Sequence, residues 1–597
     1  MSITLPTEGN AMAASSTGPI IIQSDRTVLL EVNNPLYTEA RDALARFAEL
    51  EKSPEHIHTY RITPLSLWNA AATGLAAEEI VEALTRYGKY EVPANIRTDI
   101  YEYVGRYGRL KLIREGDDLL LISDDVPLLT EIANHKRFVG YLTGQRDERT
   151  LIVDPAVRGQ IKHALVQFGF PAEDLAGYVD GAPLEVALRS ETSEGERFQL
   201  RPYQIEAVDV FYAAGGVRGG SGVIVLPCGA GKTVVGLAVI DKLQCATLVL
   251  TPNTVAARQW IEEIVDKTRI PRDAVGEYTG QRKEIKPVTV ATYQILTHRS
   301  NRDTEFPHFQ LFNERDWGLI IYDEVHLLPA PVFRITAEIQ ARRRLGLTAT
   351  LVREDGREED VFSLIGPKKY DVPWKDLEHQ GWIATAECHE VRLPLPTDGR
   401  MSYAISEEKD KYRIAAENPL KLDAMRAILD KHRDDQVLVI GQYLDQLAAI
   451  KAVLDVPIIT GKTPVREREG LYEKFRTGEI TRLIVSKVAN FAIDLPDANV
   501  AIQVSGTYGS RQEEAQRLGR ILRPKRNGLL AHFYTLVTRD TKDQEFAARR
   551  QLFLTEQGYR YEILGHDDLD DYRPVTFQAN GRPAPPVALP APSEATS

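Results

Sequence analysis

The chain has 597 residues, of which 43% are hydrophobic and 26% are charged, and its formal net charge is −12. This balance is typical of a globular protein of several domains, and it excludes a surface covered with basic patches but not a locally basic cleft. The three cysteines are far apart, which excludes a four-cysteine zinc or iron–sulfur site. No apolar run approaches the ~20 residues that span a bilayer, so we expect a cytoplasmic protein without a membrane partner.

The first third of the chain predicts two small α+β domains, over residues 19–125 and 126–190, after a disordered leader at 1–18. Short strands are expected at 20–22 and 27–32. Thr63-Pro64 is typical of a helix start, and Gly74 of the end of that helix. The second domain combines a strand at 150–153 with a helix at 157–168. The family resemblance described below implies that it is a small damage-recognition-like domain.

Between residues 87 and 109 tyrosines alternate with arginines. Such a mixture stacks on nucleic-acid bases and binds phosphates in some proteins. It also forms the amphipathic surface of many small α/β domains. The sequence leaves both interpretations open.

From Phe198 the pattern changes to short buried strands that alternate with helices, which is typical of parallel sheets covered on both faces. We predict two tandem α/β lobes, at 196–385 and 386–565, followed by a disordered tail at 566–597. The strands are expected at 223–226, 247–251, 288–292, 318–322 and 345–348 in the first lobe, and at 436–440, 457–459, 482–485, 500–503 and 531–534 in the second.

A phosphate-binding loop is predicted where the strand 223–226 runs into a turn and a helix. Glycines let the backbone approach phosphate oxygens, and the N–H groups at the helix start point toward them. In this role Lys232 would reach the β- and γ-phosphates, and the Thr233 hydroxyl would bind Mg²⁺. Leu226 stands where the usual first glycine of the pattern would be, so the segment alone is equally compatible with an ordinary turn. The loop residues are Pro227, Cys228, Gly229, Ala230, Gly231, Lys232 and Thr233.

A second motif follows the strand at 318–322, where Asp323-Glu324 precedes Val325-His326. Asp323 at the end of a strand is suited to hold Mg²⁺, and Glu324 to orient and activate the attacking water. An Asp-Glu pair that merely caps a helix is the alternative. The pair follows a strand of the same predicted sheet as the strand before Lys232, and this favours the catalytic interpretation.

The second lobe contains Gln516, Arg520 and Arg523 at helical spacing, and therefore on one helix face. Arginines presented in this way stabilise the charge of a transferring phosphoryl group from across a cleft. A solvated basic helix is the alternative for this segment taken alone.

Together these three motifs resemble those of the superfamily 2 helicases. The resemblance implies RecA-like lobes, an adenine-sensing element with Arg201 and Gln204, and a segment at 347–350 that couples hydrolysis to lobe movement. It also implies contacts to the nucleic-acid backbone. The residues implied for those contacts are Thr251, Arg258, Thr292, Gln442, Ser486 and Lys487.

Within that superfamily the chain is similar to the XPB family. The similarity rests on Arg353-Glu354-Asp355, on 486–488 with 494–499, and on the C-terminal stretches 533–541 and 550–559. It implies a DNA-contacting role for Arg353, Glu354 and Asp355, for which a charged surface turn is the alternative, and a short thumb-like insertion near 397–417.

The resemblance implies an ATP- and Mg²⁺-dependent DNA helicase or translocase that moves 3′→5′ and acts in DNA repair. Its expected partner is single-stranded or 3′-tailed duplex DNA with little sequence preference, with a nuclease or repair protein as a further possible partner. A duplex translocase without strand separation, a DNA-bound ATPase scaffold and an RNA helicase stay open as alternatives.

Overall fold

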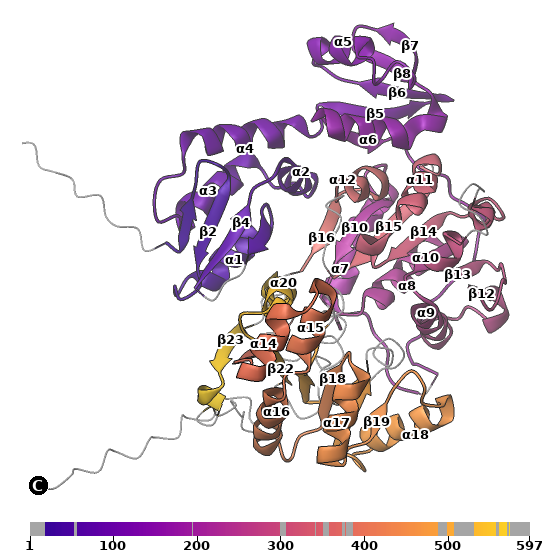
Figure 1. Cartoon of the computed structure of the whole chain (residues 1–597). Helices are drawn as coiled ribbons and strands as arrows, with labels where there is room; N and C mark the ends of the chain where they lie inside the picture. Colours follow the sequence, from indigo (N-terminus) through magenta and orange to yellow (C-terminus); the bar gives the residue numbers. More distant parts are fainter. Residues whose placement is uncertain are drawn as a thin grey trace, which may run out of the picture.

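The computed structural model describes residues 18–52, 56–193, 195–227, 229–298, 306–340, 342–349, 358–372, 377, 386–486, 498–506, 531–556, 560–569 and 572. These residues form four β-sheets, two of which have seven strands (Figure 1). Both seven-stranded sheets contain parallel pairs throughout, which confirms the predicted α/β class with two tandem lobes. In the same residues no helix is both long and apolar enough to cross a membrane. Nearly all of the predicted leader and tail lies outside the described residues.

The first domain is a four-stranded antiparallel sheet with the strand order β1-β2-β4-β3, packed against four helices. The helix start predicted at Thr63-Pro64 is confirmed, since the Thr63 Oγ1 accepts a hydrogen bond from the Ser66 N–H and the Ser66 hydroxyl accepts one from the Thr63 N–H. The elements are β1 (Ile20–Ile22), β2 (Thr27–Glu31), α1 (Tyr37–Leu44), β3 (Glu49–Lys52), β4 (Ile57–Arg61), α2 (Pro64–Ala72), α3 (Ala77–Tyr87) and α4 (Ala94–Arg106).

The second domain is a five-stranded sheet with the order β7-β8-β6-β5-β9. Its first two strands precede residue 126, so the predicted boundary at 125/126 falls inside the domain and the division lies before Leu110. The strands at 110–122 were not predicted, and their pairing with β8 and β9 is what places the division there. The elements are β5 (Leu110–Glu115), β6 (Asp118–Ile122), α5 (Val126–Asn134), β7 (Leu142–Asp147), β8 (Thr150–Val153), α6 (Arg158–Phe168) and β9 (Ala172–Leu175).

Part of the tyrosine- and arginine-rich segment serves the packing of these domains, while Tyr90 and Tyr101 are exposed. The Arg106 guanidinium lies over the rings of Tyr103 and Phe170, at 4.8 Å from each centroid. Tyr107 packs edge-on against Phe362 of the first lobe, in an apolar cluster that also contains Trp68. Within the described residues, the domain-surface interpretation therefore accounts for these side chains.

The first lobe has the strand order β12-β13-β11-β14-β15-β10-β16. Alternate residues of each central strand enter two apolar clusters, one against α7, α8 and α9 and the other against α10 and α11, so helices cover both faces. All five predicted strands are confirmed, and β12 and β16, both at edges, were not predicted. The elements are α7 (Pro202–Tyr212), β10 (Ser221–Val225), α8 (Lys232–Leu243), β11 (Thr247–Thr251), α9 (Thr254–Lys267), β12 (Val275–Tyr278), β13 (Val288–Thr292), α10 (Tyr293–Leu296), β14 (Leu319–Asp323), α11 (Ala330–Glu338), β15 (Arg343–Thr348), α12 (Glu358–Asp360) and β16 (Lys368–Asp371).

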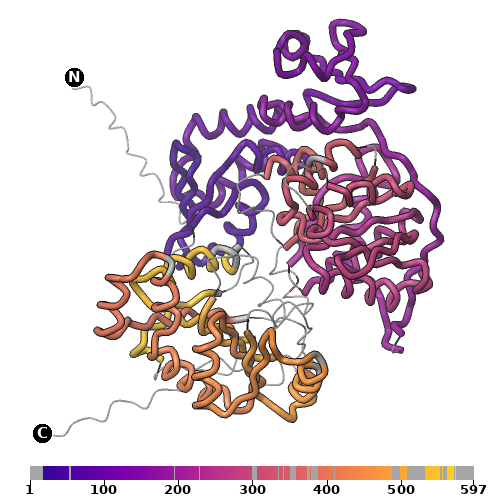
Figure 2. The backbone as a smooth tube through the Cα atoms, turned by 45° about the vertical axis from the view of Figure 1, so that its right-hand side comes forward, coloured from indigo at the N-terminus to yellow at the C-terminus, as the bar shows by residue number. Residues whose placement is uncertain are grey.

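The second lobe repeats this plan with the order β19-β20-β18-β21-β22-β17-β23. Its five predicted strands are confirmed, whereas β17 and β23 were not predicted. Figures 1 and 2 show the first domain beside the first lobe, and β3 of that domain contacts α20 of the second lobe. The elements are β17 (Ala386–Leu393), α14 (Thr397–Ile405), α15 (Glu408–Ala416), α16 (Leu420–Lys431), β18 (Val437–Gly441), α17 (Leu444–Leu454), β19 (Ile458–Ile459), α18 (Val465–Arg476), β20 (Arg482–Ser486), β21 (Val500–Gln503), β22 (Ala531–Thr538), α20 (Lys542–Glu556) and β23 (Arg560–Gly565).

A buried ion-pair network joins the second domain to the first lobe. Asp174 Oδ1 lies 2.6 Å from Arg158 Nη2, and its Oδ2 lies 2.9 Å from Lys162 Nζ. Lys162 also donates to the Gln340 side chain of the first lobe, at 3.0 Å. Burial alone would raise the pKa of Asp174, but Lys162 and Arg158 hold it well below its usual range.

We expect Asp174→Asn to lower the stability of this domain by about 3–5 kcal/mol, because two buried cations lose their counter-charge. The wild-type contribution is present above pH ~4 and is lost as the pH falls from there, since the folded-state pKa is the lower one. Hydrogen exchange of α6 and β9 measures the change. Asp118→Asn is the control, because its ion pair with Arg146 is exposed and is worth at most about 1 kcal/mol. Equal protection in the two variants would contradict the assignment.

Candidate functional site

The predicted phosphate loop lies at the carboxyl end of β10, where α8 begins. Gly229 and Gly231 have φ angles of 81° and 80°, in the left-handed region that glycine adopts without strain. Gly231 is the N-cap residue of α8, so Lys232 and Thr233 stand in its first turn. The backbone bends here as a loop that cradles an anion requires. Cys228 lies outside the described residues.

The predicted adenine-sensing residues contact the same loop from α7. The Gln204 amide donates to the Ala230 carbonyl at 3.0 Å, and its oxygen accepts the Arg201 N–H at 2.9 Å. A Cβ atom on Gly231 would lie 2.6 Å from the Gln204 nitrogen, so the close approach requires glycine. Tyr203, which the motif did not single out, donates to the Ala230 carbonyl as well, at 2.7 Å.

Both carboxylates of the Asp-Glu pair come to this edge of the sheet. The Lys232 Nζ lies 3.5 Å from the Glu324 Oε1, with only 13% and 16% of the two side chains exposed. Glu324 itself has a left-handed backbone, with φ 49° and ψ 56°. The Glu324 Oε2 lies 3.6 Å from the His326 Nδ1, which hydrogen-bonds the Thr348 hydroxyl at 2.7 Å. The loop, the Asp-Glu pair and the segment at 347–350 are thus in contact.

Asp323 is held by a residue that motif reasoning missed. The Trp260 indole N–H donates to the Asp323 Oδ2 at 2.9 Å, and the Trp260 ring packs over Gly236 of α8. Burial, followed by the charge of Glu324, raises the pKa of Asp323 to about 7, against the opposing effects of Trp260 and Lys232. A bound cation would favour its ionised form. Because Trp260 is distant in sequence, only a contact map would have revealed it.

The residues implied for nucleic-acid contact divide into buried and exposed groups. Thr251 and Thr292 are register partners on β11 and β13, and both side chains are buried. The Thr251 hydroxyl donates to the Ala291 carbonyl, and the Thr292 hydroxyl caps α10. These side chains are therefore committed to the fold of the lobe.

Arg258 is half-exposed and donates to the Gln281 side chain at 2.5 Å. In the second lobe Ser486 is buried at the end of β20, and Gln442 follows β18 with its N–H donating to the Ser505 hydroxyl. Six further predicted site residues lie outside the described residues: Arg353, Glu354, Asp355, Gln516, Arg520 and Arg523. Lys487 lies outside them as well.

The expected thumb is a pair of short helices, α14 and α15. The Tyr412 ring of α15 is buried, and its hydroxyl donates to the Gly506 carbonyl, so this side chain does not face solvent. Lys411 and Arg413 are paired with Glu408 and Glu417. Neighbouring acidic side chains thus largely neutralise the positive charge of these two residues.

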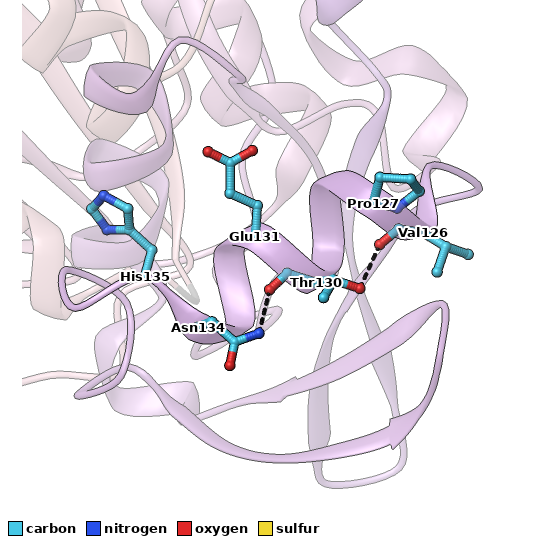
Figure 3. Close-up of a pocket in the computed structure, with 6 residues that line it drawn as sticks. All are labelled: Val126, Pro127, Thr130, Glu131, Asn134 and His135. Atoms are coloured by element: carbon cyan, nitrogen blue, oxygen red, sulfur yellow. Dashed lines mark hydrogen bonds between the residues drawn. The ribbon is translucent and has the colours of Figure 1, made fainter.

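A shallow hollow runs along α5 of the second domain, and Figure 3 shows its side chains. Thr130 and Asn134 bond to carbonyls of their own helix there. The hollow is remote in the fold from the phosphate loop and contributes no residue to it.

Three family models match the chain. Residues 377–581 match "ERCC3/RAD25/XPB C-terminal helicase", and residues 197–353 match "Type III restriction enzyme, res subunit". Residues 20–147 match "Helicase conserved C-terminal domain", although they form the amino-terminal domains here.

Curated relatives cover nearly the whole chain. A DNA 3′-5′ helicase XPB of Mycobacterium tuberculosis is 56% identical over 92% of this chain and 98% of its own length. The protein of that name from Kineococcus radiotolerans is 54% identical over 93% and 97%. The XPB helicase/translocase subunit of the general transcription and DNA repair factor IIH of Antonospora locustae is 34% identical over 92% and 81%.

We expect Gly236→Ala to destabilise the first lobe by about 1–3 kcal/mol through overpacking. The added Cβ would lie 2.5 Å from the buried Trp260 ring, which supports Asp323. Urea unfolding measures the change. Gly470→Ala on α18 is the control, since a Cβ there meets nothing within 4 Å and should stabilise the helix by about 0.4–1 kcal/mol. Equal midpoints for the two variants would be inconsistent with the tight packing.

Proposed function

This chain belongs to the XPB family of DNA helicases, and we propose that it couples ATP hydrolysis at the loop following β10 to 3′→5′ movement along DNA in DNA repair. The observation that carries the proposal is the approach of Lys232 to Glu324 at the sheet edge, 3.5 Å apart and mostly shielded from water. A lysine on a glycine-rich loop and an acidic pair at a strand end are the groups that phosphoryl transfer uses for positioning and charge.

Each residue of the pocket has a role in this proposal. Lys232 would bind the β- and γ-phosphates, and the Gln204 side chain would read the adenine base from its place against the loop. Thr233 and Asp323 fit Mg²⁺, because a hydroxyl and a buried carboxylate supply the oxygen ligands that this ion prefers. When bound, Mg²⁺ would neutralise charge on the phosphates. Trp260 would act as a positioning residue that fixes the Asp323 carboxylate.

Glu324 would take the proton of the attacking water. The Lys232 Nζ, 3.5 Å from the Glu324 carboxylate, would bind the phosphates, which would leave the carboxylate available to the water. His326 then links Glu324 to Thr348 and so transmits a change at the site to the segment after β15. From the second lobe, Gln516, Arg520 and Arg523 would complete the pocket.

DNA would be bound chiefly through its phosphates, so binding should show little sequence preference and weaken strongly with salt. Arg258 and Gln442 offer side chains for this, with Lys487 and Arg353–Asp355. The buried side chains of Thr251, Thr292 and Ser486 would contribute to DNA binding indirectly, by fixing the position of the backbone around them. A nuclease or another repair protein is a proposed partner, in a cytoplasmic setting.

We expect Glu324→Gln to keep ATP affinity within a few-fold and to lower turnover by about 10²–10⁴-fold, because the amide accepts no proton. Nucleotide binding and steady-state phosphate release measure the two quantities. Glu338→Gln on the exposed end of α11 is the matched control and should hydrolyse at the wild-type rate. A Glu324→Gln enzyme that turns over normally would refute the assignment.

We expect ATP-dependent strand displacement on a duplex with a 3′ tail and none on a duplex with a 5′ tail. Displacement of a triplex strand without duplex separation would indicate a duplex translocase instead. An ATPase rate that does not respond to DNA would indicate a DNA-bound switch, and stronger stimulation by single-stranded RNA than by DNA would contradict the substrate class.

A further inference from the structure

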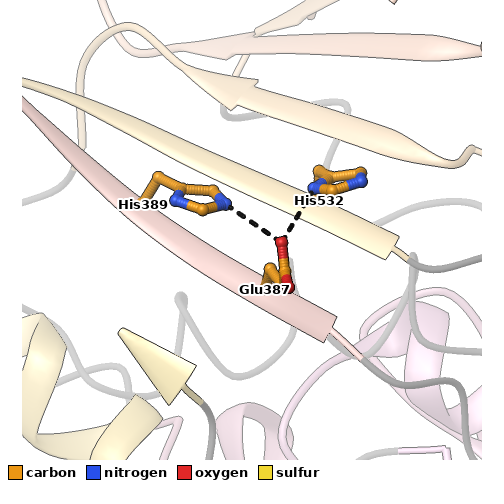
Figure 4. Close-up of side chains that lie close together, drawn as sticks. All are labelled: Glu387, His389 and His532. Atoms are coloured by element: carbon orange, nitrogen blue, oxygen red, sulfur yellow. Dashed lines mark ion pairs between the residues drawn. The ribbon is translucent and has the colours of Figure 1, made fainter. Parts of the chain in front are cut away.

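Two histidines and a glutamate gather on one face of the second lobe, away from the phosphate loop. Glu387 and His389 are two residues apart on β17, so they point to the same face, and His532 of β22 is the register partner of Glu387. All three stand near the amino-terminal ends of their parallel strands. Figure 4 shows the carboxylate between the two imidazole rings.

The distances around this carboxylate suit a shared cation. The Glu387 Oε2 lies 3.7 Å from the His389 Nε2 and 3.7 Å from the His532 Nδ1. One donor atom from each residue lies within 4.8 Å of the others. Donors bound at 2.0–2.2 Å around a tetrahedral zinc ion are about 3.3–3.5 Å apart. The two Glu387–imidazole separations would need to shorten only slightly, whereas the two imidazole nitrogens, which lie within 4.8 Å of each other, would need to approach by up to about 1.5 Å.

A further carboxylate orients one of the rings. The Glu562 Oε2 on β23 lies 3.4 Å from the His389 Nδ1, where it would accept the N–H of that nitrogen and leave the Nε2 as the donor to a metal. The Tyr572 hydroxyl hydrogen-bonds the same Nε2 at 2.9 Å, so a metal ion at this nitrogen would displace that bond, and the phenol oxygen or a water molecule would then be available as the fourth donor. Two carboxylates beside two buried imidazoles favour a bound positive charge.

A neighbouring histidine, His432, lies beside this cluster. Its ring packs against that of His532 at a tilt, with ring centroids 4.9 Å apart. Both of its nitrogens have close partners, Asp435 at 2.8 Å and the Tyr534 hydroxyl at 2.9 Å. The 3.7 Å separations at Glu387 are too long for hydrogen bonds by comparison.

We propose that Glu387, His389 and His532 bind one divalent transition-metal ion of the zinc class. Imidazole with carboxylate suits Zn²⁺, Co²⁺ and Ni²⁺ rather than Mg²⁺ or Ca²⁺. The ion would tie β17 to β22 from the face covered by α16. It has a path from solvent, since 19% of the Glu387 side chain and 58% of the Glu562 side chain are exposed.

The test uses the full chain carrying Asp323→Asn, so that the proposed Mg²⁺ site does not contribute. After treatment with a chelator, Co²⁺ is titrated while its visible absorption and the heat of binding are recorded. We expect one Co²⁺ per chain, with the intense absorption of a four- or five-coordinate site, and displacement by Zn²⁺.

His532→Ala and Glu387→Gln should each weaken Co²⁺ binding by about 100-fold or more, and Glu562→Gln by about 10-fold. His432→Gln is the matched control and should bind as the parent does. Circular dichroism establishes that each variant is folded, and Glu387→Gln serves if a histidine variant is not. Absence of stoichiometric binding, or binding unchanged in Glu387→Gln, would overturn the proposal. The outcome is independent of ATP turnover, so it stands apart from the proposed motor function.

Discussion

The structure of the site depends on where parallel strands end. In the first lobe β10, β14 and β15 all deliver polar groups to one edge, so Lys232, Asp323 and Thr348 meet although they are far apart in the chain. The cost is a partly buried carboxylate at the end of an apolar strand. The Trp260 N–H offsets part of that cost by donating a hydrogen bond to the Asp323 Oδ2. Trp260 lies on α9, and its ring can pack against α8 at this point because Gly236 has no side chain.

Much of the fold follows from local pattern, and the exceptions share a cause. The ten strands expected in the two lobes are found because each is a continuous apolar run. β12, β16, β17 and β23 were missed because they carry charged residues, such as Glu277 in β12 and Lys368 in β16. All but β17 are edge strands, and β17 lies between β22 and β23. β5 and β6 were also missed, and their sheet is set by long-range pairing with β8 and β9, which local pattern does not encode.

The site divides in the same way. Lys232, Asp323 and Glu324 could be predicted because short motifs carry them, and their chemistry limits what can stand there. Trp260 and Tyr203 support them through contacts that no spacing rule expresses. Glu387, His389 and His532 were overlooked for this reason too, since the two histidines lie on different strands and metal motifs are recognised from close spacing. For Thr251 and Thr292 burial, rather than residue type, decides that the side chains serve the lobe.

The segment rich in tyrosine and arginine shows how burial can reassign a motif. Its side chains look suited to nucleic acid, yet Tyr107 packs against Phe362 of the first lobe. From α2 of the same domain, Trp68 joins this cluster and Asn69 accepts the Lys368 N–H at 2.9 Å. Lys162 adds a polar contact to Gln340. Apolar packing and buried hydrogen bonds therefore attach both amino-terminal domains to the lobe that carries Lys232. Since such contacts are lost only at a cost of several kcal/mol, we expect these domains to stay with the first lobe, so that a movement between the lobes would act on the contact of β3 with α20.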